Sequence, residues 1–207
     1  TEFFKVASMY LTEKNINKNP FTQFDIWFED AKKIGLKDSN AMNVASASKD
    51  GMPSSRMVLL KSYDENGFVF YTNYTSRKSK EIIDNPNVAL NFFWDALERQ
   101  VRVEGKIQKV DPAISDKYYD SRSRLSQLGA HASNQSQTIE SYEVITNKLA
   151  ILEERYEGKK IPRPEHWGGF VIIPETIEFW QGHEGRIHDR LKFKKEGPGW
   201  KINRLSP

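Results

Sequence analysis

The chain contains no cysteine among its 207 residues. This absence excludes disulfide frameworks, iron–sulfur clusters, thiolate nucleophiles and cysteine-based zinc sites. Any redox chemistry must therefore come from an organic cofactor or from a metal held by histidine and carboxylate side chains. The chain also lacks an apolar run close to the ~20 residues of a membrane helix, and its first residues lack the layout of a signal peptide. Together these absences predict a soluble, cytoplasmic protein.

Phosphate-binding glycine motifs are also missing. The 12 glycines form neither a P-loop nor a G-x-G-x-x-G motif, so side chains and helix ends would have to hold any phosphate. Lys and Arg number 31 against 28 Asp and Glu, a formal charge of +3, which does not by itself indicate a polyanion partner. Aromatic residues, at 12%, are plentiful and supply large side chains for a core, which excludes a disordered chain.

Strands follow one another in this sequence instead of alternating with helices. Turn signals and hydrophobic periodicity predict helices over 20–34, 76–84, 112–121 and 141–156, and strands over 41–48, 55–63, 68–72, 88–94, 99–110, 169–173, 176–181, 187–193 and 200–205. This order predicts an α+β fold with an antiparallel sheet or barrel, and disfavours a doubly wound nucleotide-binding fold. We interpret residues 1–19 as an N-terminal arm and 20–207 as one domain. The polar stretch 121–138 is predicted to be a long loop, of the kind that is usually functional or mobile.

Basic residues open the helix predicted over 76–84. If Ser76 caps this helix, Arg77, Lys78 and Lys80 lie at the positive end of its dipole, where cations are disfavoured by about 0.3–1 kcal/mol each. An anion bound there would explain the arrangement, because free backbone N–H groups and the cations would all face it. A solvated basic turn explains this segment alone equally well.

Cations also alternate along the strand predicted over 187–193. At a period of two, Arg186, His188 and Arg190 share one face, as Lys192 does. Such a row suits an anionic or electron-rich planar ligand. It would equally protect an exposed sheet edge from pairing with another chain.

A third pair of cations, Arg56 and Lys61, brackets a strand that reads as buried. Five residues apart, the two side chains face opposite sides of a regular strand, so a bulge or a strand end would have to turn one of them into a shared site. Two end residues that extend to solvent are the simpler account. Gln100 and Trp180 are weaker candidates for contact with a flat ligand, and His188 lacks partners for a metal site.

Most of these candidates fall in short segments with specific sequences, and their order along the chain is informative. The segments are RMVLLK (56–61), FYTN (70–73), SRK (76–78), LERQV (97–101), SQLGA (126–130), WGGF (167–170), EFWQG (178–182), RIHDR (186–190) and the final RLSP (204–207). In this order they closely resemble the pyridoxine (pyridoxamine) 5′-phosphate oxidases. The resemblance runs from about Pro20 to Pro207, nearly the whole chain.

The resemblance implies an antiparallel split β-barrel with peripheral helices that binds flavin mononucleotide (FMN) at the interface of a homodimer with shared active sites. It implies an FMN-dependent oxidase of vitamin B6 metabolism that converts pyridoxamine or pyridoxine 5′-phosphate to pyridoxal 5′-phosphate with O2, releasing H2O2. No nucleic acid, membrane or metal enters this prediction. The family's lid-forming arm is not clearly reproduced by residues 3–10, so no lid residue is assigned.

The resemblance also assigns roles by position. The flavin contacts would be Arg56, Leu59, Lys61, Tyr71, Thr72, Ser76, Arg77, Lys78, Gln100, Gln135, Ser136, Trp180 and Arg190. The substrate contacts would be Lys61, Tyr118, Arg122, Ser126, Arg186 and His188, of which Arg186 and His188 are the predicted catalytic residues. Two phosphates need two cationic sets, so Arg56, Arg77 and Lys78 suit the flavin phosphate, and Lys61 with Arg122 suits the substrate phosphate.

Two other functions remain open at the level of sequence. One is a split-barrel protein that binds flavin or pyridoxal phosphate without turnover. The other is a basic β-barrel that binds nucleic acid through Lys, Arg and aromatic side chains. The complete set of predicted substrate contacts favours the enzyme over the binder without turnover.

Overall fold

The computed structural model of the protein describes residues 10–207, so the first nine residues of the predicted arm lie outside the described chain. The elements in chain order are α1 (Pro20–Lys33), β1 (Ala41–Ala47), β2 (Pro53–Leu59), β3 (Ser62–Asp64), β4 (Gly67–Asn73), α2 (Arg77–Asp84), β5 (Asn87–Trp94), η1 (Asp95–Leu97), β6 (Arg99–Lys109), α3 (Pro112–Asp120), α4 (Arg124–Ala132), α5 (Glu143–Arg155), β7 (Trp167–Gln181), η2 (Glu184–Arg186), β8 (Asp189–Glu196) and β9 (Gly199–Arg204). None of the helices in this part of the chain has both the length and the apolar composition to cross a bilayer.

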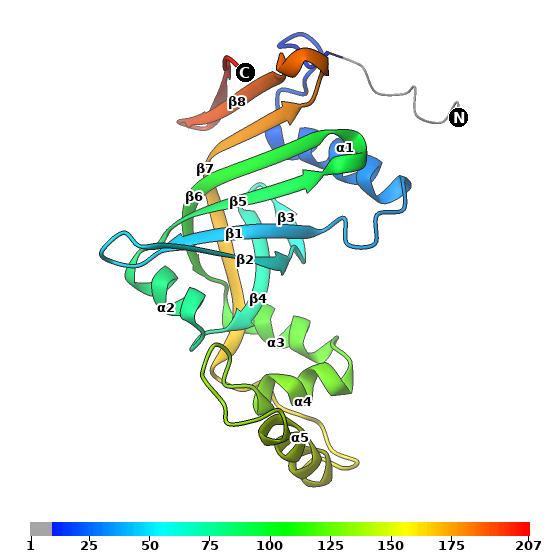
Figure 1. Ribbon diagram of the computed structural model, residues 1–207, viewed down its shortest axis with the longest axis vertical. Helices are drawn as coiled ribbons and strands as arrows, with labels where there is room; N and C mark the ends of the chain where they lie inside the picture. Colours follow the sequence, from blue (N-terminus) through cyan, green and yellow to red (C-terminus); the bar gives the residue numbers. More distant parts are fainter. Residues whose placement is uncertain (1–9) are drawn as a thin grey trace.

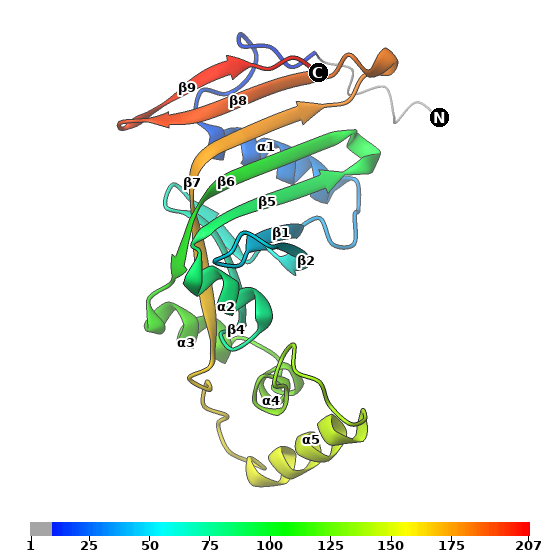
Figure 2. The same cartoon turned by 60° about the vertical axis from the view of Figure 1, so that its left-hand side comes forward.

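All of these strands join one curled antiparallel sheet (Figure 1). The strand order is β2-β1-β5-β6-β7-β4-β3, with β8 on β7 and β9 on β8. Helices α3, α4 and α5 gather at one end of the molecule, and β8 and β9 lie at the other (Figure 2). The predicted α+β fold with an antiparallel split barrel is confirmed.

One long strand, β7, connects the two ends of the molecule (Figure 2). The sequence predicts two strands here, over 169–173 and 176–181, but the structure has one of 15 residues with a register shift against β6. The shift lies at Gly105, opposite Pro174, which has no N–H to donate to the ladder. A side chain at position 105 would collide with the Ile173 carbonyl, so glycine allows the bend without ending the strand.

Helix α1 packs on the sheet and closes the main core. Asn19 caps it by accepting hydrogen bonds from the N–H groups of Phe21 and Thr22, and Pro20 occupies its first turn. Phe24, which is fully buried, contacts the rings of Phe68 and Phe92 at centroid distances of 5.1 and 5.0 Å. Aromatic burial of this kind makes the sheet a rigid support for the residues at its edges.

A second, smaller core lies at the helical end of the molecule. The sequence predicts a loop over 121–138, but residues 124–132 form α4. Ser123 caps α4 by accepting a hydrogen bond from the Ser126 N–H, and Leu128 is buried against Tyr119 and Trp167. A nine-residue helix is marginal in isolation, so this tertiary packing, absent from the local sequence pattern, stabilises it.

Candidate active site

A cavity of about 1030 Å³ lies between β2, β4, the start of α2 and the α3–α4 segment. Its wall carries the cationic side chains of Arg56, Lys61, Arg77, Lys78 and Arg122, and no Asp or Glu of the described chain lines it. Ligand pockets typically measure about 300–1,000 Å³, so this space suits one large ligand or two smaller ones. Five positive charges facing one space indicate that its ligands carry anionic groups.

The start of α2 forms one wall of this cavity. The helix begins at Arg77 with Ser76 in the N-cap position, as the sequence predicts, but the Ser76 side chain makes no capping hydrogen bond. The first N–H groups of a helix carry partial positive charge, and Arg77 and Lys78 add two full charges beside them. Lys80 is exposed and does not line the cavity. The geometry therefore favours Arg77 and Lys78, and not Lys80, as anion ligands.

Lys78 is the most enclosed of the five cations, with 8% of its surface exposed. Its Nζ donates to Thr72 Oγ1 at 2.8 Å, to Ser76 Oγ at 3.2 Å and to Gln135 Oε1 at 2.6 Å. Burial, together with the charge of Arg56, lowers the pKa of Lys78 to about 8. A bound anion would offset this effect because it favours the charged ammonium.

Arg56 and Lys61 both line the cavity, although strict alternation would place them on opposite faces. The single strand predicted over 55–63 is wrong: β2 ends at Leu59 and β3 begins at Ser62, so Lys61 lies at the break. The Lys61 N–H donates to the Val69 carbonyl at 2.9 Å, which holds the break against β4. A strand end therefore turns Lys61 toward the space that Arg56 faces.

Stacked aromatic rings and one arginine form the opposite wall. The rings of Tyr71 and Tyr118 stack at a centroid distance of 3.9 Å, and Trp167 lies 5.6 Å from Tyr71. The Arg122 guanidinium lies 4.4 Å from the Trp167 ring centre, and its buried Nη1 has no hydrogen-bond partner within the described chain. Burial lowers the pKa of Arg122. A buried charged donor without a partner costs about 1–3 kcal/mol or more, so this atom points to an anionic ligand.

The other predicted residues that line the cavity are Leu59, Tyr71, Thr72, Tyr118, Ser126, Gln135 and Ser136. Ser136 has a φ of 71°, in the left-handed region that a non-glycine residue rarely adopts. Backbone strain of this kind is concentrated at ligand sites, where the surrounding structure enforces it. The predicted contact Ser76 does not line the cavity, but its hydroxyl accepts from Lys78.

Five predicted site residues lie elsewhere, at the β8 end of the sheet. Gln100 on β6 is opposite Trp180 on β7, and Trp180 is opposite Arg190 on β8. The ring of His188 lies 4.6 Å from that of Trp180, and Arg186 is exposed two residues before it. None of the five lines the cavity. The structure thus divides the predicted site between two places on one chain.

The predicted strand face that carries Arg186 and His188 is wrong. Arg186 lies in η2 with a φ of 62°, after Gly185 with a φ of 69°, and β8 begins only at Asp189. Two successive residues in the left-handed region turn the chain, so alternation does not apply before residue 189. Of the predicted row, Arg190 and Lys192 alone share a strand face.

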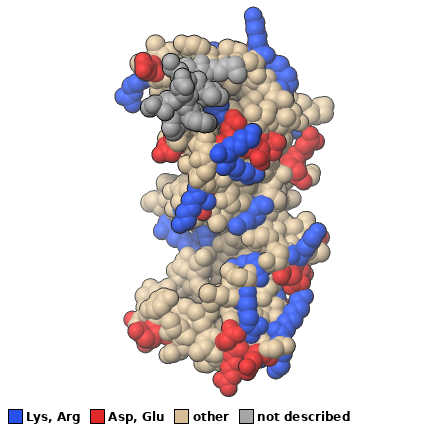
Figure 3. Space-filling view, turned by 90° about the vertical axis from the view of Figure 1, so that its right-hand side faces the viewer, with Lys and Arg blue, Asp and Glu red and all other residues tan. Residues whose placement is uncertain are grey.

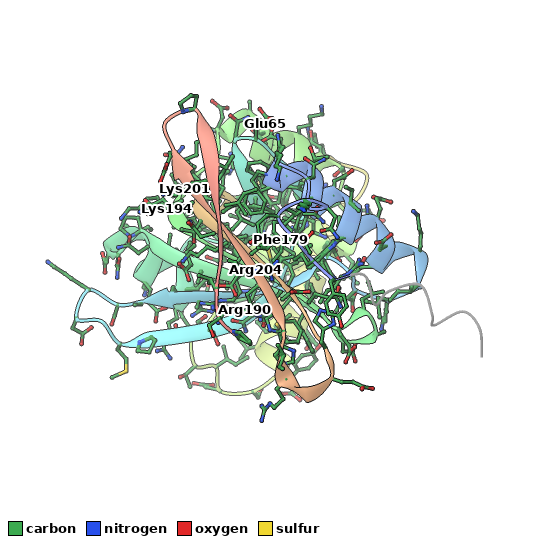
Figure 4. The ribbon with its side chains drawn as sticks, turned by 90° about the horizontal axis from the view of Figure 1, so that it is seen from above. Glu65, Phe179, Arg190, Lys194, Lys201 and Arg204 are labelled. Atoms are coloured by element: carbon green, nitrogen blue, oxygen red, sulfur yellow. The ribbon has the colours of Figure 1, made fainter. Side chains whose placement is uncertain are left out.

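The same turn fixes the hydrogen bonding of His188. Its Nδ1 accepts the His183 backbone N–H at 3.1 Å, so in the neutral ring Nε2 carries the proton. Arg190 is held as well, because its Nε donates to Glu178 Oε1 at 2.8 Å. Arg190 and Arg204 lie near each other on β8 and β9 (Figure 4). This end of the molecule therefore carries an oriented imidazole, that of His188, between Arg186 in η2 and Arg190 in β8 along the chain.

Glu81 is missing from the sequence-based predictions, although the sequence carries a signal for it. Glu81 lies four residues after Arg77, at the spacing of a helical ion pair. Its carboxylate accepts from Arg77 Nε at 2.9 Å and from Arg56 Nη2 at 3.2 Å. The acidic residue at that spacing was the available clue, but only the structure brings Arg56 to the same carboxylate.

Comparison with known sequences identifies one family along nearly the whole chain. Residues 28–156 match the family described as pyridoxamine 5′-phosphate oxidase, and residues 167–207 match the pyridoxine 5′-phosphate oxidase C-terminal dimerisation region. The pyridoxine/pyridoxamine 5′-phosphate oxidase of Rubrobacter xylanophilus is 55% identical over 197 residues, which cover 95% of this chain and 91% of that protein. The enzyme of the same name from Gloeothece citriformis is 54% identical over 198 residues, which cover 95% of this chain and 92% of that protein.

Solved structures agree on the fold. PhzG from Burkholderia lata, in complex with tetrahydrophenazine-1-carboxylic acid, superposes with a TM-score of 0.89 at 27% identity, covering 96% of this chain and 98% of that one. A pyridoxamine 5′-phosphate oxidase-related, FMN-binding protein from Nostoc punctiforme superposes with a TM-score of 0.71 at 13% identity, covering 92% of this chain and 100% of that one. At 13% identity the second likeness concerns the fold alone.

Proposed function

This chain belongs to the pyridoxamine 5′-phosphate oxidase family, and from that premise we propose how its residues hold a flavin and a phosphorylated substrate. The protein is an oxidase of pyridoxine or pyridoxamine 5′-phosphate, as its relatives at 50–55% identity over 95% of the chain are. The family and its fold indicate a flavin cofactor. We propose that this flavin is FMN, held by residues of the cavity.

The cavity residues fit FMN and a substrate phosphate together. Arg56, Arg77 and Lys78 lie on the β2 and α2 side of the cavity and would hold the FMN phosphate. Leu59, Tyr71, Thr72, Gln135 and Ser136 would contact the rest of the cofactor, with Ser76 supporting Lys78. The observation that carries the proposal is the concentration of five cations, one with an orphaned buried donor, in one cavity.

The substrate phosphate would lie against the helical wall. Arg122 offers its unpartnered Nη1 there, Lys61 offers an ammonium from the strand break, and Tyr118 and Ser126 add hydroxyl groups. Two phosphates bound by separate cationic sets explain why the cavity carries more charge than one monophosphate requires.

A second copy of the chain would complete the site. The dimerisation region, residues 167–207, includes Trp180, Arg186, His188 and Arg190, which lie outside the cavity of their own chain. Among the residues that line the cavity, Met57 and Leu59 are 61% and 39% accessible, and such exposed apolar side chains suit burial against a partner. In a twofold dimer each cavity receives the same group from the other copy, so both sites form at once.

The mechanism assigns positioning roles to the side chains of this protein. The chemistry that FMN supplies when bound is two-electron oxidation of the substrate, with return of the electrons to O2 as H2O2. Arg122 and Lys61 neutralise the substrate phosphate and fix its position. Arg186 and the Nε2–H of His188 would hold the pyridine ring and its substituents, because the His183 N–H already occupies Nδ1. Orientation of two bound rings accounts for much of such a rate enhancement.

The two alternatives make different predictions from the oxidase. On the one face that Figure 3 shows, Lys and Arg side chains are interspersed with Asp and Glu and form no continuous basic stripe of the kind that nucleic-acid binding uses. Addition of pyridoxamine 5′-phosphate without oxygen should bleach the visible flavin absorbance of the purified protein, and oxygen should restore it with formation of H2O2. A yellow protein that forms neither pyridoxal 5′-phosphate nor H2O2 would be the binder without turnover.

Changing Arg122 to methionine should raise the KM for pyridoxine 5′-phosphate by about 10–100-fold and leave FMN affinity unchanged. The reason is the loss of one charge-assisted hydrogen-bonding group to a phosphate, worth about 1.5–3 kcal/mol. Steady-state kinetics and FMN titration measure the two effects. Release of FMN from this variant would show that Arg122 holds the flavin and that its assignment to the substrate phosphate is wrong.

Affinity for FMN should fall as the pH rises through about 8. The pKa of Lys78 is lowered to about 8 by burial, so above that pH the free protein presents a neutral amine to the phosphate. FMN binding should then be accompanied by proton uptake. Titrations of FMN and riboflavin from about pH 7 to about pH 9.5 test this, because riboflavin has no phosphate and its affinity should stay level. A parallel fall for both flavins would contradict the role of Lys78.

A further inference from the structure

A buried carboxylate lies directly behind the wall of the cavity. The Glu81 side chain, 8% exposed, is on α2 one turn after Arg77. Its Oε2 accepts from Ser46 Oγ at 2.6 Å, Ser54 Oγ at 2.5 Å and Arg56 Nη2 at 3.2 Å. Its Oε1 accepts from Arg77 Nε at 2.9 Å. Burial raises the pKa of Glu81, but these four hydrogen bonds together lower it to about 2, so the group stays ionised.

A carboxylate in this place needs an explanation, because its charge opposes a phosphate. The two arginines that it binds are the two that the proposed function assigns to the FMN phosphate. Within the described chain, the Nη groups of Arg56 donate to Val44 O and to the hydroxyls of Ser46 and Ser54, besides Glu81. Its direction is therefore over-determined.

Arg77 is held by a single contact. Glu81 accepts from Nε, and no other hydrogen bond of Arg77 is made in residues 10–207, so both of its Nη groups stay available. The Arg77 side chain is 63% exposed, so without Glu81 it would sample many rotamers. A guanidinium that is held through Nε directs its two Nη groups away from the carboxylate. These two groups form the planar fork that binds a phosphate.

We propose that Glu81 is the positioning residue of the flavin phosphate site, which fixes the guanidinium group of Arg77, and adds one of four contacts to that of Arg56, before the ligand arrives. The inference rests on the proposed function, since it presumes that these arginines bind the phosphate. Preorganisation lowers the entropy that binding must remove, and this gain exceeds the unfavourable charge of the carboxylate.

Glutamine at position 81 shows which of these two effects is larger, because it removes the negative charge and one acceptor oxygen together. It has the same shape but one acceptor oxygen and one NH2 group, whereas the structure uses both carboxylate oxygens as acceptors. If the amide oxygen faces Ser46, Ser54 and Arg56, its NH2 faces the Nε–H of Arg77 and repels it. If the amide is flipped, Arg56 and the two hydroxyls lose their shared acceptor. The first orientation keeps three of the four hydrogen bonds to residue 81 and is favoured, so the expected loss is the contact that holds Arg77.

The test compares dissociation constants for FMN and riboflavin, measured by flavin fluorescence, in the wild type and in Glu81→Gln. We expect FMN to bind about tenfold more weakly and riboflavin to bind unchanged, since only FMN carries the phosphate. The matched control is Glu29→Gln, which removes one carboxylate from an exposed ion pair with Lys32 and should change neither constant.

Three outcomes would overturn the inference: unchanged FMN affinity, tighter FMN binding, or an equal loss for both flavins, which would mean that Glu81 only maintains the fold. A wild type without any preference for FMN over riboflavin would instead refute the proposed function, so the two failures are distinguishable.

A second variant keeps the inference testable if Glu81→Gln does not fold. Arg77→Lys changes an exposed residue, keeps the positive charge and leaves Glu81 intact. A single ammonium cannot hold the carboxylate with one group while it offers a planar fork to the phosphate. The FMN preference over riboflavin should therefore fall by about three- to tenfold, and an unchanged preference would overturn the proposal.

Discussion

Replacement of Arg186 and His188 together by alanine is expected to lower turnover by about a thousandfold while FMN remains bound. Both side chains lie outside the cavity of their own chain, and from the partner copy they are assigned to the pyridine ring, so the flavin phosphate site should not be affected. What is lost is the grip on the pyridine ring, and orientation combined with proton placement supplies factors of this size. Single-turnover kinetics with pyridoxamine 5′-phosphate, together with the visible spectrum of the purified variant, measure both parts. Colourless protein would mean that these residues hold the flavin.

Lys194→Ala is the matched control for that variant. It removes an exposed cation from β8, the strand that follows His188, and Lys194 belongs to no predicted site (Figure 4). Turnover should stay within about twofold of the wild type, as expected for a surface substitution. A large loss in the control would show that the charge of this strand, and not the two named side chains, controls the rate.

The double variant also tests whether two copies share a site. When it is mixed and reassembled with a cavity variant such as Arg77→Ala/Lys78→Ala, a mixed dimer contains one intact cavity facing one intact Arg186–His188 group. Random exchange should then restore about a quarter of the wild-type activity from two inactive proteins. If activity is not recovered although subunit exchange is proven, both groups of residues belong to a site built by a single chain.

Replacement of Arg77 and Lys78 by alanine should weaken FMN binding by at least about a hundredfold. Each side chain supplies a charge-assisted hydrogen bond worth about 1.5–3 kcal/mol, and neighbouring contributions are not additive, so the combined loss is set at the lower end. Riboflavin affinity should change much less, because it lacks the phosphate. Unchanged FMN affinity would show that the start of α2 does not bind the FMN phosphate.

Lys80→Ala provides the control on the same helix. Lys80 carries the same charge as Lys78 and lies two residues away, but it is exposed and does not line the cavity. Its removal should leave FMN affinity within about twofold of the wild type. Loss of the Lys78 ammonium also removes the donor to Thr72 and Gln135. The thermal unfolding of the wild type, of Arg77→Ala/Lys78→Ala and of Lys80→Ala should therefore be compared as well.

Short-range sequence signals are enough to place helices but not the irregular parts of the chain. Helices α1, α2 and α3 follow from periodicity and capping residues, and α3 begins with Asp111 as cap and Pro112 in its first turn, as predicted. The errors lie where the chain departs from regular repeats. The break at Lys61, the turn at Arg186 and the packing of α4 depend on contacts with residues far away in sequence, such as Lys61 N–H with Val69 and Leu128 with Trp167.

The sequence by itself determined the class of chemistry: a chain without thiols, cations in place of glycine loops as the candidate phosphate ligands, and nine short segments in the order of one oxidase family. Only the tertiary structure decided which cations meet. Arg56, Lys61, Arg77, Lys78 and Arg122 converge on one cavity, whereas Arg186, His188 and Arg190 lie at the far end of the sheet. The reason is physical: side-chain identity and helix or strand periodicity are local properties, but convergence depends on strand register and on packing between distant segments.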